Sequence, residues 1–420
     1  MDKILINGGK KLFGSVRVSS AKNAYLPILA GSILCSGEVV LNNYPKFDDI
    51  DIMCEILSSI GIKKKTSQTS LLLDCRSITG HEIPEYQTKL IRSSIFSLGS
   101  ILGRVKKAKV AYPGGCAIGA RPIDLHIKGL RSLNVKILEE DNYLICDGSN
   151  MKCADIYLDF PSVGATENVM MAATTLKGIS RIINPAKEPE IVDLQNFLNA
   201  MGAKVSGAGT NEIVIKGVET LSSVNYTPIP DRIITGTMII ACAMTGGKIT
   251  IENAKAEHVQ SLINKIDKYC CNIKCDNDKI IVQADGKPKS FGTVNTEPYP
   301  GFPTDLQAQL SALACVCKGE SKIVENLFET RFKHIPELVK MGGKIEIDGK
   351  QANIKGVKRL HGAIVKSSDL RGGACLVLAG LTAKGQTIVE DVQHIDRGYE
   401  HIEDVFKNLG ADIKRIKDEI

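Results

Sequence analysis

The feature that most constrains this chain is a pattern of helix, tight turn and strand that recurs six times. Residues 57–63 (LSSIGIK) and 198–204 (LNAMGAK) show it most clearly. Each copy has a glycine or asparagine after the last apolar helical residue, which suits the left-handed conformation that ends many helices. These turn residues are about 70 residues apart and are Gly61, Asn134, Gly202, Asn272, Gly342 and Gly410. Units of that length are too long for a solenoid, and each has room for a small βαβ-containing subdomain.

A second recurring pattern is a turn glycine, a β-branched strand and a polar strand end, followed by a loop and a new helix. It covers residues 37–42, 178–184, 247–253, 319–326 and 385–391, and in the second repeat we expect the strand at 108–112. The loops after these strands contain Cys116, Arg331 and Arg397. Because loops at one end of repeated α/β units collect function, we expect two domains of three units each, with a cleft between them.

Length and composition agree with this organisation. A chain of 420 residues is too long for one ordinary core. Aromatic residues are scarce at 5% and tryptophan is absent, which argues against stacking platforms for single-stranded nucleic acid. A net charge of +6, if concentrated in a cleft, suits a substrate that carries phosphates and carboxylates.

The N-terminus (MDKILINGG) lacks the apolar region of a signal peptide, and apolar runs such as 238–244 are too short for a membrane span. We therefore expect a cytoplasmic protein whose 13 cysteines stay reduced. The cysteines show no paired C-x2-C motif, so we expect no metal site and interpret most of them as small buried hydrophobic residues.

One cysteine differs from the rest because of its surroundings. Cys116 lies in the loop 113–122 (PGGCAIGARP), where three glycines let the backbone approach a ligand closely. Arg121 and Lys128 are near it in sequence, and a cationic setting lowers a thiol's pKa and raises its reactivity. The alternative is one more buried cysteine.

A helix start at Lys22 and Asn23 is a candidate anion site, with Ser19 or Ser20 as a possible cap. Arginine forks bind carboxylates and phosphates, and the candidates are Arg92, Arg121, Arg331, Arg371 and Arg397. Any single arginine of this kind is more often part of a surface ion pair. Asp305 could be a catalytic carboxylate or could cap the helix that follows it. These local patterns indicate an α/β enzyme for an anionic substrate.

Taken together, the motifs resemble those of the UDP-N-acetylglucosamine 1-carboxyvinyltransferase family of the EPSP synthase superfamily. They are Lys22-Asn23, the segment 113–127 (PGGCAIGARPIDLHI), Phe302-Pro-Thr-Asp305, Arg331, Asp369-Leu-Arg371 and Asp396-Arg-Gly-Tyr-Glu400. The resemblance runs in order from about residue 6 to 410. Ser20 and Ser93 depart from it, since the family pattern leads us to expect glycine and alanine there.

The resemblance implies an inside-out α/β barrel of two domains, each with three βαβαββ units. The domains are expected at 1–21 plus 229–420, and at 22–228, the latter carrying the cysteine loop at about 112–122. The implied reaction is addition–elimination, in which the sugar 3-hydroxyl adds to C2 of phosphoenolpyruvate and phosphate then leaves. This is the first committed step of peptidoglycan synthesis, and it requires no metal or organic cofactor.

The resemblance also implies roles for individual residues. Cys116 donates a proton to C3 and can form a covalent adduct, while Asp305 is the base. Lys22, Arg121 and Arg397 bind the phosphate, and Arg331 and Arg371 bind the carboxylate, with Asn23 beside them. The residues implied for the nucleotide sugar are Asn23, Arg92, Arg121, Pro122, Ile123, Asp124, Leu125, Ser162, Val163, Gly164, Asp305 and Leu327. A thiol at position 116 also implies alkylation by the epoxide fosfomycin.

Three rival hypotheses remain at this point. The shikimate-pathway enolpyruvyl transferase shares the fold and the donor but does not use a loop cysteine. A catalytically silent paralogue would have lost Lys22, Cys116, Asp305 or Arg397, and all four are present. Nucleic-acid binding is a distant third. We expect small-molecule substrates, no membrane insertion and no obligate protein partner.

Overall fold

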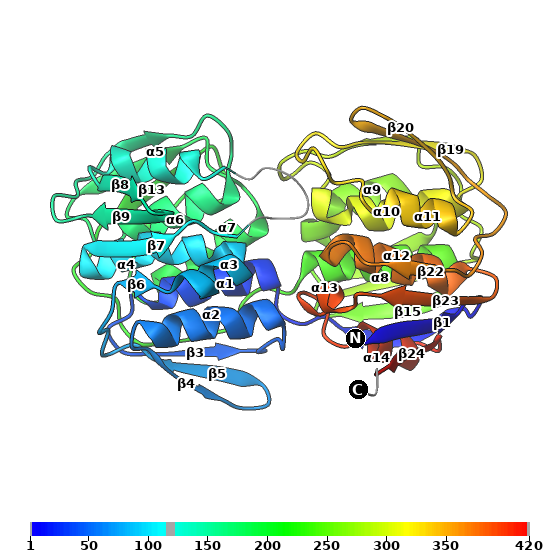
Figure 1. The fold of residues 1–420 in the computed structure, drawn as a ribbon, viewed down its shortest axis with the longest axis horizontal. Coiled ribbons are helices and arrows are strands. Elements are labelled where there is room, and N and C mark those ends of the chain that lie inside the picture. Colours follow the sequence, from blue (N-terminus) through cyan, green and yellow to red (C-terminus); the bar gives the residue numbers. More distant parts are fainter. Residues whose placement is uncertain (1, 115–121, 418–420) are drawn as a thin grey trace. The chain divides into compact units, whose positions relative to one another are not determined.

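The computed structural model of the chain describes residues 2–114 and 122–417. These residues form two compact units, coloured along the sequence in Figure 1. Unit 1 comprises 2–19 and 230–417, and unit 2 comprises 20–114 and 122–229. In the described part, the chain passes from one unit to the other after Ser19 and again after Ile229.

Unit 2 contains three four-stranded sheets with the strand orders β14-β3-β5-β4, β6-β7-β9-β8 and β10-β11-β13-β12. Their strands are β3 (Glu38–Asn42), β4 (Lys63–Thr66), β5 (Ser70–Asp74), β6 (Glu82–Ile83), β7 (Lys107–Ala111), β8 (Lys136–Glu140), β9 (Tyr143–Asp147), β10 (Asp155–Tyr157), β11 (Ile179–Ile183), β12 (Lys204–Ser206), β13 (Glu212–Lys216) and β14 (Val224–Tyr226). The helices are α1 (Lys22–Ser32), α2 (Asp48–Ser59), α3 (Glu85–Leu90), η1 (Arg92–Phe96), α4 (Ser97–Val105), α5 (Asp124–Ser132), α6 (Val163–Ala173) and α7 (Pro189–Ala200).

Unit 1 repeats this arrangement with the orders β16-β17-β15-β2, β18-β19-β21-β20 and β22-β23-β1-β24. Its strands are β1 (Lys3–Asn7), β2 (Leu12–Arg17), β15 (Gly247–Glu252), β16 (Asn272–Asp276), β17 (Lys279–Ala284), β18 (Thr293–Asn295), β19 (Glu320–Val324), β20 (Lys344–Asp348), β21 (Gln351–Lys355), β22 (Ile364–Lys366), β23 (Gln386–Glu390) and β24 (Asp412–Ile416). The helices are α8 (Arg232–Thr245), η2 (Ala256–Val259), α9 (Gln260–Ile266), η3 (Thr304–Leu306), α10 (Gln307–Val316), α11 (Ile335–Lys340), α12 (Leu370–Thr382), α13 (Gln393–Asp396) and α14 (Ile402–Asn408).

All six sheets share one topology, which confirms the expected repeat. In each sheet one edge pair of strands is parallel and the other two pairs are antiparallel. The strands predicted from the second sequence pattern are β3, β7, β11, β15, β19 and β23. In its own sheet, each of them pairs in parallel with an edge strand.

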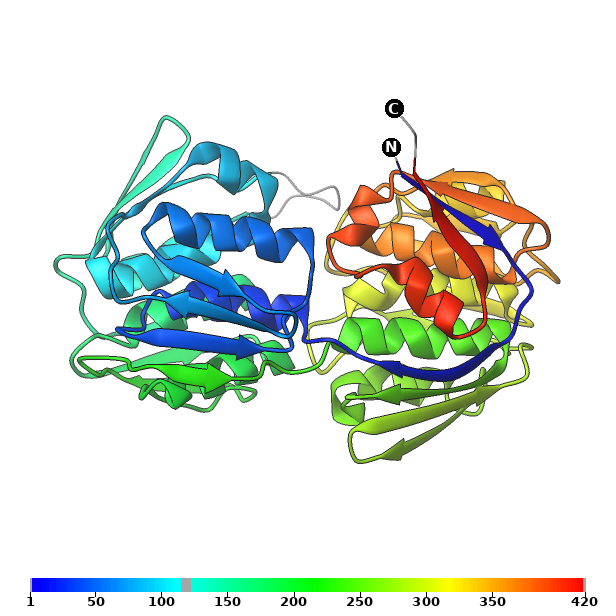
Figure 2. The ribbon, with the colours of Figure 1, turned by 90° about the horizontal axis from the view of Figure 1, so that it is seen from below.

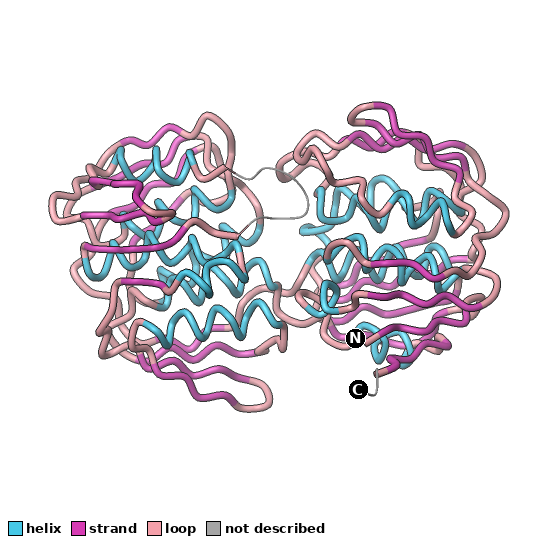
Figure 3. Tube along the Cα trace, viewed as in Figure 1, coloured by secondary structure: helices cyan, strands magenta, loops and turns pink. Residues whose placement is uncertain are grey.

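The helices at the centre of each unit are buried on nearly every side, and Figure 3 shows helices enclosed between strands in each unit. In unit 2 these inner helices are α1, α4 and α6, and in unit 1 they are α8, α10 and α12. A helix that is apolar all round must be covered all round. Close approach requires glycine at one crossing, because a Cβ on Gly99 of α4 would lie 2.1 Å from the backbone oxygen of Asn168 in α6. The helices therefore lie inside and the sheets outside, as the inside-out barrel predicts.

The predicted turn residues have positive φ at five of the six positions, namely Gly61, Asn134, Gly202, Gly342 and Gly410. The prediction for Asn272 is wrong, because Asn272 begins strand β16. There the helix ends early at Ile266, and Lys268 takes the left-handed conformation with φ 67°. The Lys268 N–H donates to the Cys271 oxygen at 2.7 Å, so a longer turn replaces the single-residue one.

The N-terminal strand belongs to the C-terminal sheet. Strand β1 pairs antiparallel with β23 on one side and with β24 on the other, and Figure 2 shows the blue strand beside the red one. The chain thus completes its last sheet with its first strand.

Two further sequence expectations concern cysteines and membrane spans. All described cysteines are buried except Cys153 and Cys275, which confirms that most are packing residues. In the described ranges, no helix has the length and apolar character to cross a membrane.

The buried face of β1 gives a stability prediction. The Ile6 side chain is fully buried, and its Cδ1 would lie 2.8 Å from a Cβ on Gly380 of α12. We expect Ile6→Ala to lower the free energy of unfolding by about 3 kcal/mol, because it leaves a cavity under α12. Urea unfolding followed by circular dichroism measures this. Phe13→Ala is the control, because Phe13 lies on β2, the next strand in the sequence, and its side chain is 57% exposed. This variant should change the free energy of unfolding by less than about 0.5 kcal/mol. Equal losses in both variants contradict the assignment of β1 to the core.

Candidate active site

The candidate residues gather at equivalent places in the repeats. One set lies where an inner helix begins after its edge strand: Lys22 at α1, Arg92 at η1, Ser162 at α6, Asp305 in η3 and Arg371 in α12. The other set lies in loops after the paired strands, where Arg331 follows β19 and Arg397 follows β23.

Unit 1 brings together three of the predicted residues around one carboxylate. Arg331 Nη2 donates to Asp305 Oδ1 at 2.6 Å, and Arg371 Nη2 donates to Asp305 Oδ2 at 3.2 Å. The arginine side chains are only 4% and 6% exposed, whereas that of Asp305 is 26% exposed. Two buried guanidinium groups therefore share one carboxylate that reaches solvent.

The charge state of this group follows from its contacts. Burial by itself raises the pKa of a carboxyl group, but the charges of Arg371 and Arg331 hold the pKa of Asp305 well below its ordinary range. In Arg371, burial lowers the pKa of the guanidinium, and the charge of Asp305 outweighs this and raises it. Asp305 and Arg371 are therefore both ionised at neutral pH. As a base, Asp305 is weak while both arginines remain on it.

The alternative reading of Asp305 as a helix cap is wrong. Helix α10 has Leu306 at its N-cap and no side-chain cap, and the Asp305 carboxylate is directed to the arginines instead. The cap of α12 is Asp369, whose Oδ1 accepts from the N–H groups of Arg371 and Gly372 at 3.0 Å each. The cap fixes the start of α12 and with it the backbone of Arg371.

A buried polar network supports Arg371 from below. Its Nη1 donates to the Tyr399 hydroxyl at 3.5 Å, and the guanidinium lies 5.8 Å from the centre of the Tyr399 ring. The same hydroxyl accepts from Gln309 Nε2 at 3.1 Å and lies 2.9 Å from Thr237 Oγ1. Because Tyr399 is two residues after Arg397, the network joins the Arg397 segment to the three inner helices of unit 1.

Glu325 organises the loop that follows β19. Its Oε1 accepts from Thr296 Oγ1 at 2.8 Å and from the Leu327 N–H at 2.9 Å, and its Oε2 accepts from Thr304 Oγ1 at 2.9 Å. Thr304 directly precedes Asp305, so one buried carboxylate ties the predicted Leu327 to the segment that holds Asp305.

Unit 2 holds the predicted cation Lys22 at the start of α1. Lys22 Nζ donates to Asp49 Oδ2 at 2.9 Å, and both side chains are buried. Neither predicted serine caps the helix: the N-cap is Ala21, and the Ser20 hydroxyl donates to the Pro228 oxygen at 3.2 Å. Helix α1 has no acidic residue in its first turn, all of which is described, so its positive end adds to the charge of Lys22. Asn23 is the second residue of this helix.

The remaining nucleotide-sugar candidates in unit 2 are linked through His126. Asn168 Nδ2 lies 2.8 Å from His126 Nδ1 and 2.8 Å from the Ile95 oxygen, which joins α5, α6 and η1. A Cβ on Gly164 would lie 2.9 Å from the His126 ring, so α6 requires glycine there. Ser162 caps α6 by accepting from the Ala165 N–H at 3.4 Å. The starts of η1, α5 and α6, and with them Arg92, Asp124 and Val163, are therefore held in one assembly.

A hollow of about 770 Å³ lies on the same unit. Its lining includes the predicted residues Pro122, Ile123 and Asp124, together with Lys128 and Arg131. Lys128 is an exposed partner of Asp159, with Nζ 2.6 Å from Oδ2. Leu125, also predicted, is the second residue of α5 and is half-buried.

Two predicted residues, Cys116 and Arg121, lie outside the described residues. Among the cysteines that are described, burial raises the thiol pKa of Cys54 and Cys146 to about 12 each. Such groups are inert packing residues at neutral pH.

Sequence reasoning missed three residues that the site depends on: Asp49, Glu325 and Tyr399. Asp49 is in the first turn of α2, after paired strand β3. It therefore occupies the place that Arg331 and Arg397 occupy in other repeats, and a strict alignment of the repeats could have indicated it. Tyr399 stands in the motif Asp396-Arg-Gly-Tyr-Glu400, but the sequence assigned it no role, because its contacts come from helices distant in the sequence.

The shared carboxylate generates a testable prediction. Asp305→Asn keeps the side-chain size but leaves two buried guanidinium groups without their carboxylate, so we expect the free energy of unfolding at pH 7 to fall by roughly 2 kcal/mol. A carboxyl group with a lowered folded pKa stabilises the folded state above its unfolded pKa and loses this effect as the pH falls toward the folded value. The difference between wild type and variant, measured by urea unfolding, should be constant above about pH 5 and shrink below about pH 4.

The matched control for this variant is Asp159→Asn, which breaks the exposed Lys128–Asp159 pair. We expect a change below about 0.5 kcal/mol there at every pH. If Asp305→Asn is as stable as the wild type at pH 7, the carboxylate does not balance the arginines.

Comparisons with known proteins show the family to which the chain belongs. The family model described as EPSP synthase (3-phosphoshikimate 1-carboxyvinyltransferase) matches residues 6–406. UDP-N-acetylglucosamine 1-carboxyvinyltransferase 2 of Caldanaerobacter subterraneus subsp. tengcongensis is 50% identical over 99% of this chain and 100% of that protein. UDP-N-acetylglucosamine 1-carboxyvinyltransferase of Pseudoalteromonas atlantica is 47% identical over 99% of this chain and 100% of its own length.

Two solved structures share the fold. The enolpyruvyl transferase NikO from Streptomyces tendae aligns with a TM-score of 0.87 at 22% identity, over 99% of this chain and 98% of that one. EPSP synthase from Acinetobacter baumannii aligns with a TM-score of 0.76 at 15% identity, over 99% of this chain and 100% of that chain. With the full-length identity to the first two relatives, these findings place the chain in the UDP-N-acetylglucosamine 1-carboxyvinyltransferase family, within the larger group of EPSP synthase-like enolpyruvyl transferases.

Proposed function

We propose that this protein transfers the enolpyruvyl group of phosphoenolpyruvate to the 3-hydroxyl of UDP-N-acetylglucosamine and releases phosphate. This reaction takes place in the cytoplasm and is the first committed step of peptidoglycan synthesis. Peptidoglycan synthesis serves cell-wall growth and cell division. The observation that carries the proposal is the Asp305 carboxylate shared by buried Arg331 and Arg371. It supplies a base and a carboxylate-binding pair at one place, and it occurs in a chain about half identical to enzymes named for this reaction.

The carboxylate of phosphoenolpyruvate competes with Asp305 for the two arginines. Guanidinium forks bind carboxylates bidentately, so the substrate draws Arg331 and Arg371 partly away from Asp305. The pKa of Asp305 then rises from its depressed value, because the nearby positive charges that lower it are neutralised by the substrate. Asp305 becomes a better base when the donor substrate has bound, and it takes the proton of the sugar hydroxyl as that oxygen bonds to C2.

The phosphate is bound by the remaining cations. Lys22 at the N-terminus of α1, Arg121 and Arg397 fill this role, with Asn23 adjacent to Lys22. Lys22 is already paired with Asp49, so its buried amino group has a carboxylate partner before the phosphate arrives. The positive ends of inner helices and these cations stabilise the charge on the phosphate as it leaves.

The residues proposed for the nucleotide sugar are those that the family resemblance implies. In unit 2 these are Arg92, Arg121, the run Pro122 to Leu125 along the hollow, and Ser162 to Gly164 at the start of α6. In unit 1, Leu327 and Asp305 contribute. The start of α6, which has no acidic residue in its described first turn, and the basic side chains suit a ligand that has two phosphates and several hydroxyls.

Cys116 completes the reaction as a proton donor. Its thiol gives a proton to C3 of phosphoenolpyruvate during addition, and the tetrahedral intermediate then loses a proton from C3 as the C2–O bond to phosphate breaks. A reactive thiol there also forms a covalent adduct with phosphoenolpyruvate and is alkylated by fosfomycin. The residue types present need no metal or organic cofactor for these steps.

The proposal is tested by measuring phosphate release from phosphoenolpyruvate with and without UDP-N-acetylglucosamine, together with the mass of the nucleotide product. We expect release only when both substrates are present, and a product heavier by one enolpyruvyl group. Sugar-nucleotide binding without phosphate release favours a silent paralogue. Release with shikimate 3-phosphate instead of the nucleotide sugar favours the shikimate-pathway enzyme.

The role of Cys116 gives a separate prediction. We expect Cys116→Ala to lower kcat by at least about 100-fold, since general acid catalysis contributes on the order of 10² to 10⁴. Its Kd for UDP-N-acetylglucosamine, measured by calorimetry, should stay within about two-fold of the wild type. Fosfomycin should add one adduct to the wild type and none to the variant, as read by mass spectrometry.

Cys275→Ala is the control, because Cys275 is an exposed cysteine on β16. It should retain both full turnover and the adduct. Loss of nucleotide-sugar binding in a folded Cys116→Ala protein counts against the proton-donor role.

A further inference from the structure

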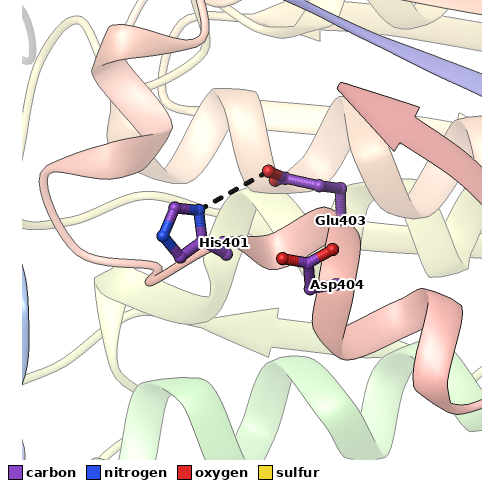
Figure 4. A group of neighbouring side chains, drawn as sticks. All are labelled: His401, Glu403 and Asp404. Atoms are coloured by element: carbon purple, nitrogen blue, oxygen red, sulfur yellow. Dashed lines mark ion pairs between the residues drawn. The ribbon is translucent and has the colours of Figure 1, made fainter. Parts of the chain in front are cut away.

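A cluster of acidic side chains lies beside the segment that carries Arg397. Figure 4 shows three residues of this part of the chain, His401, Glu403 and Asp404. His401 Nδ1 is 3.7 Å from Glu403 Oε1. Their ligand atoms are close enough to hold a metal ion. However, both oxygens of Glu403 already accept from Arg415, by Nε at 2.7 Å and by Nη2 at 3.2 Å. The cation of this cluster is therefore a guanidinium group.

Arg415 binds more than one carboxylate. Its Nη1 donates to Asp396 Oδ2 at 2.9 Å and its Nη2 to Asp396 Oδ1 at 2.6 Å, which is a bidentate pair. Nη1 also lies 3.5 Å from Asp2 Oδ2. The Arg415 side chain is only 16% exposed, so solvent screens these contacts less than it screens a surface pair. Hydrogen bonds that Arg415 donates to Asp396 and Glu403 raise the pKa of Arg415, against the effect of burial.

Strand β24 fixes the origin of the Arg415 side chain. Arg415 pairs with Ile4 of central strand β1. Alternate residues of a strand share a face, so Arg415 lies on the face of buried Ile413, against which α14 packs. The guanidinium thus rests on a paired strand and reaches the last residue of α13 and the first turn of α14.

The residue that Arg415 holds most tightly, Asp396, directly precedes Arg397. On the other side of Arg397, a Cβ on Gly398 would lie 2.8 Å from the Leu370 side chain, and the Tyr399 hydroxyl belongs to the buried network under Arg371. The backbone of Arg397 is therefore fixed from both sides: by Arg415 through Asp396, and by the inner helices through Tyr399.

We propose that Arg415 is a positioning residue for the phosphate-binding Arg397, holding Asp396 so that the Arg397 guanidinium is directed to the phosphate of the donor substrate. This inference rests on the proposed function. Arg415 touches no substrate itself and acts through the carboxylate of Asp396.

The charge of Arg415 has a second consequence for the same residue. A carboxylate next to Arg397 in the chain is a competitor for its guanidinium group. While Arg415 occupies both oxygens of Asp396, that competition is suppressed. Removing Arg415 releases Asp396, which can then pair with Arg397 and reduce its attraction for phosphate.

The test compares Arg415→Met with wild type in steady-state kinetics for both substrates. A misplaced binding group costs on the order of 10- to 100-fold, so we expect KM for phosphoenolpyruvate to rise by about ten-fold or more. The inhibition constant of inorganic phosphate should rise in parallel. KM for UDP-N-acetylglucosamine should stay within about two-fold. Arg415→Lys keeps the positive charge but not the forked guanidinium group. Its KM for phosphoenolpyruvate should lie between those of the wild type and Arg415→Met.

The double variant Arg415→Met/Asp396→Asn separates competition from general loosening. Asparagine cannot neutralise Arg397, so part of the lost phosphoenolpyruvate affinity should return. No recovery, with KM unchanged from the single variant, overturns the competition part of the proposal. If Arg415→Met does not fold, Arg415→Lys alone must show the selective rise in KM.

Two control variants isolate the effect from stability and from the mere loss of an ion pair. Ile413→Ala removes buried packing from the same strand and should lower the unfolding midpoint without a selective change in KM. Arg76→Met breaks another bidentate pair, in which Nε and Nη2 contact Asp74 at 2.8 and 2.7 Å, and should change neither KM. Equal rises in both KM values for Arg415→Met, or a selective rise in Ile413→Ala as well, overturn the proposal. Absence of transfer in the wild type refutes the proposed function instead.

Discussion

The inner helices of this protein have buried side chains on every face, and a single four-stranded sheet cannot cover such a helix. Each repeat contributes one inner helix and one sheet, so three repeats together enclose three helices. This requirement fixes the size of a unit and the direction of its inner helices. It also brings the helix starts, and the loops after the paired strands, to equivalent places, where polar side chains do not disturb the core. Lys22, Asp305 and Arg371 lie at these helix starts, so their positions follow from how the inner helices are enclosed.

The described cations proposed to bind phosphoenolpyruvate lie near carboxylates in this structure. Lys22 is paired with Asp49, Arg331 and Arg371 share Asp305, and Arg397 follows an aspartate that Arg415 occupies. Binding an anion at Arg331 and Arg371 is therefore an exchange of one carboxylate for another. An exchange avoids burying unpaired charges at any stage, and it favours ligands that offer at least as good a set of acceptors. It also couples binding to chemistry, because the displaced carboxylate of Asp305 is the proposed base.

Much of this arrangement could be predicted from the sequence, since turns and strand ends carry local signals. Glycine and asparagine marked five of the six helix ends, because the left-handed conformation restricts which residues can stand there. The exception, Asn272, lies where a shorter helix makes a longer turn possible, and local sequence does not encode helix length sharply. The contacts of Asp305 could not be read from its surroundings, because its partners come from loops and helices far along the chain. Ser19 or Ser20 was predicted as the cap because serine is a residue type that caps helices. Instead, the Ser20 hydroxyl donates to the Pro228 oxygen and Ala21 stands at the cap.

The pairing of β1 with β23 and β24 has a consequence for the order in which the protein is made. Synthesis runs from the N-terminus, and domains fold as units as they emerge. The described parts of unit 2, 20–114 and 122–229, lie between the two parts of unit 1 in the sequence, so unit 2 can fold while translation continues. Strand β1 is made before unit 2, but its two partners are made after it. Until they appear it is an apolar strand with both edges unpaired, a state that invites aggregation. A nascent chain stalled before β23 therefore carries a folded half and an exposed strand, which is the kind of surface that chaperones bind.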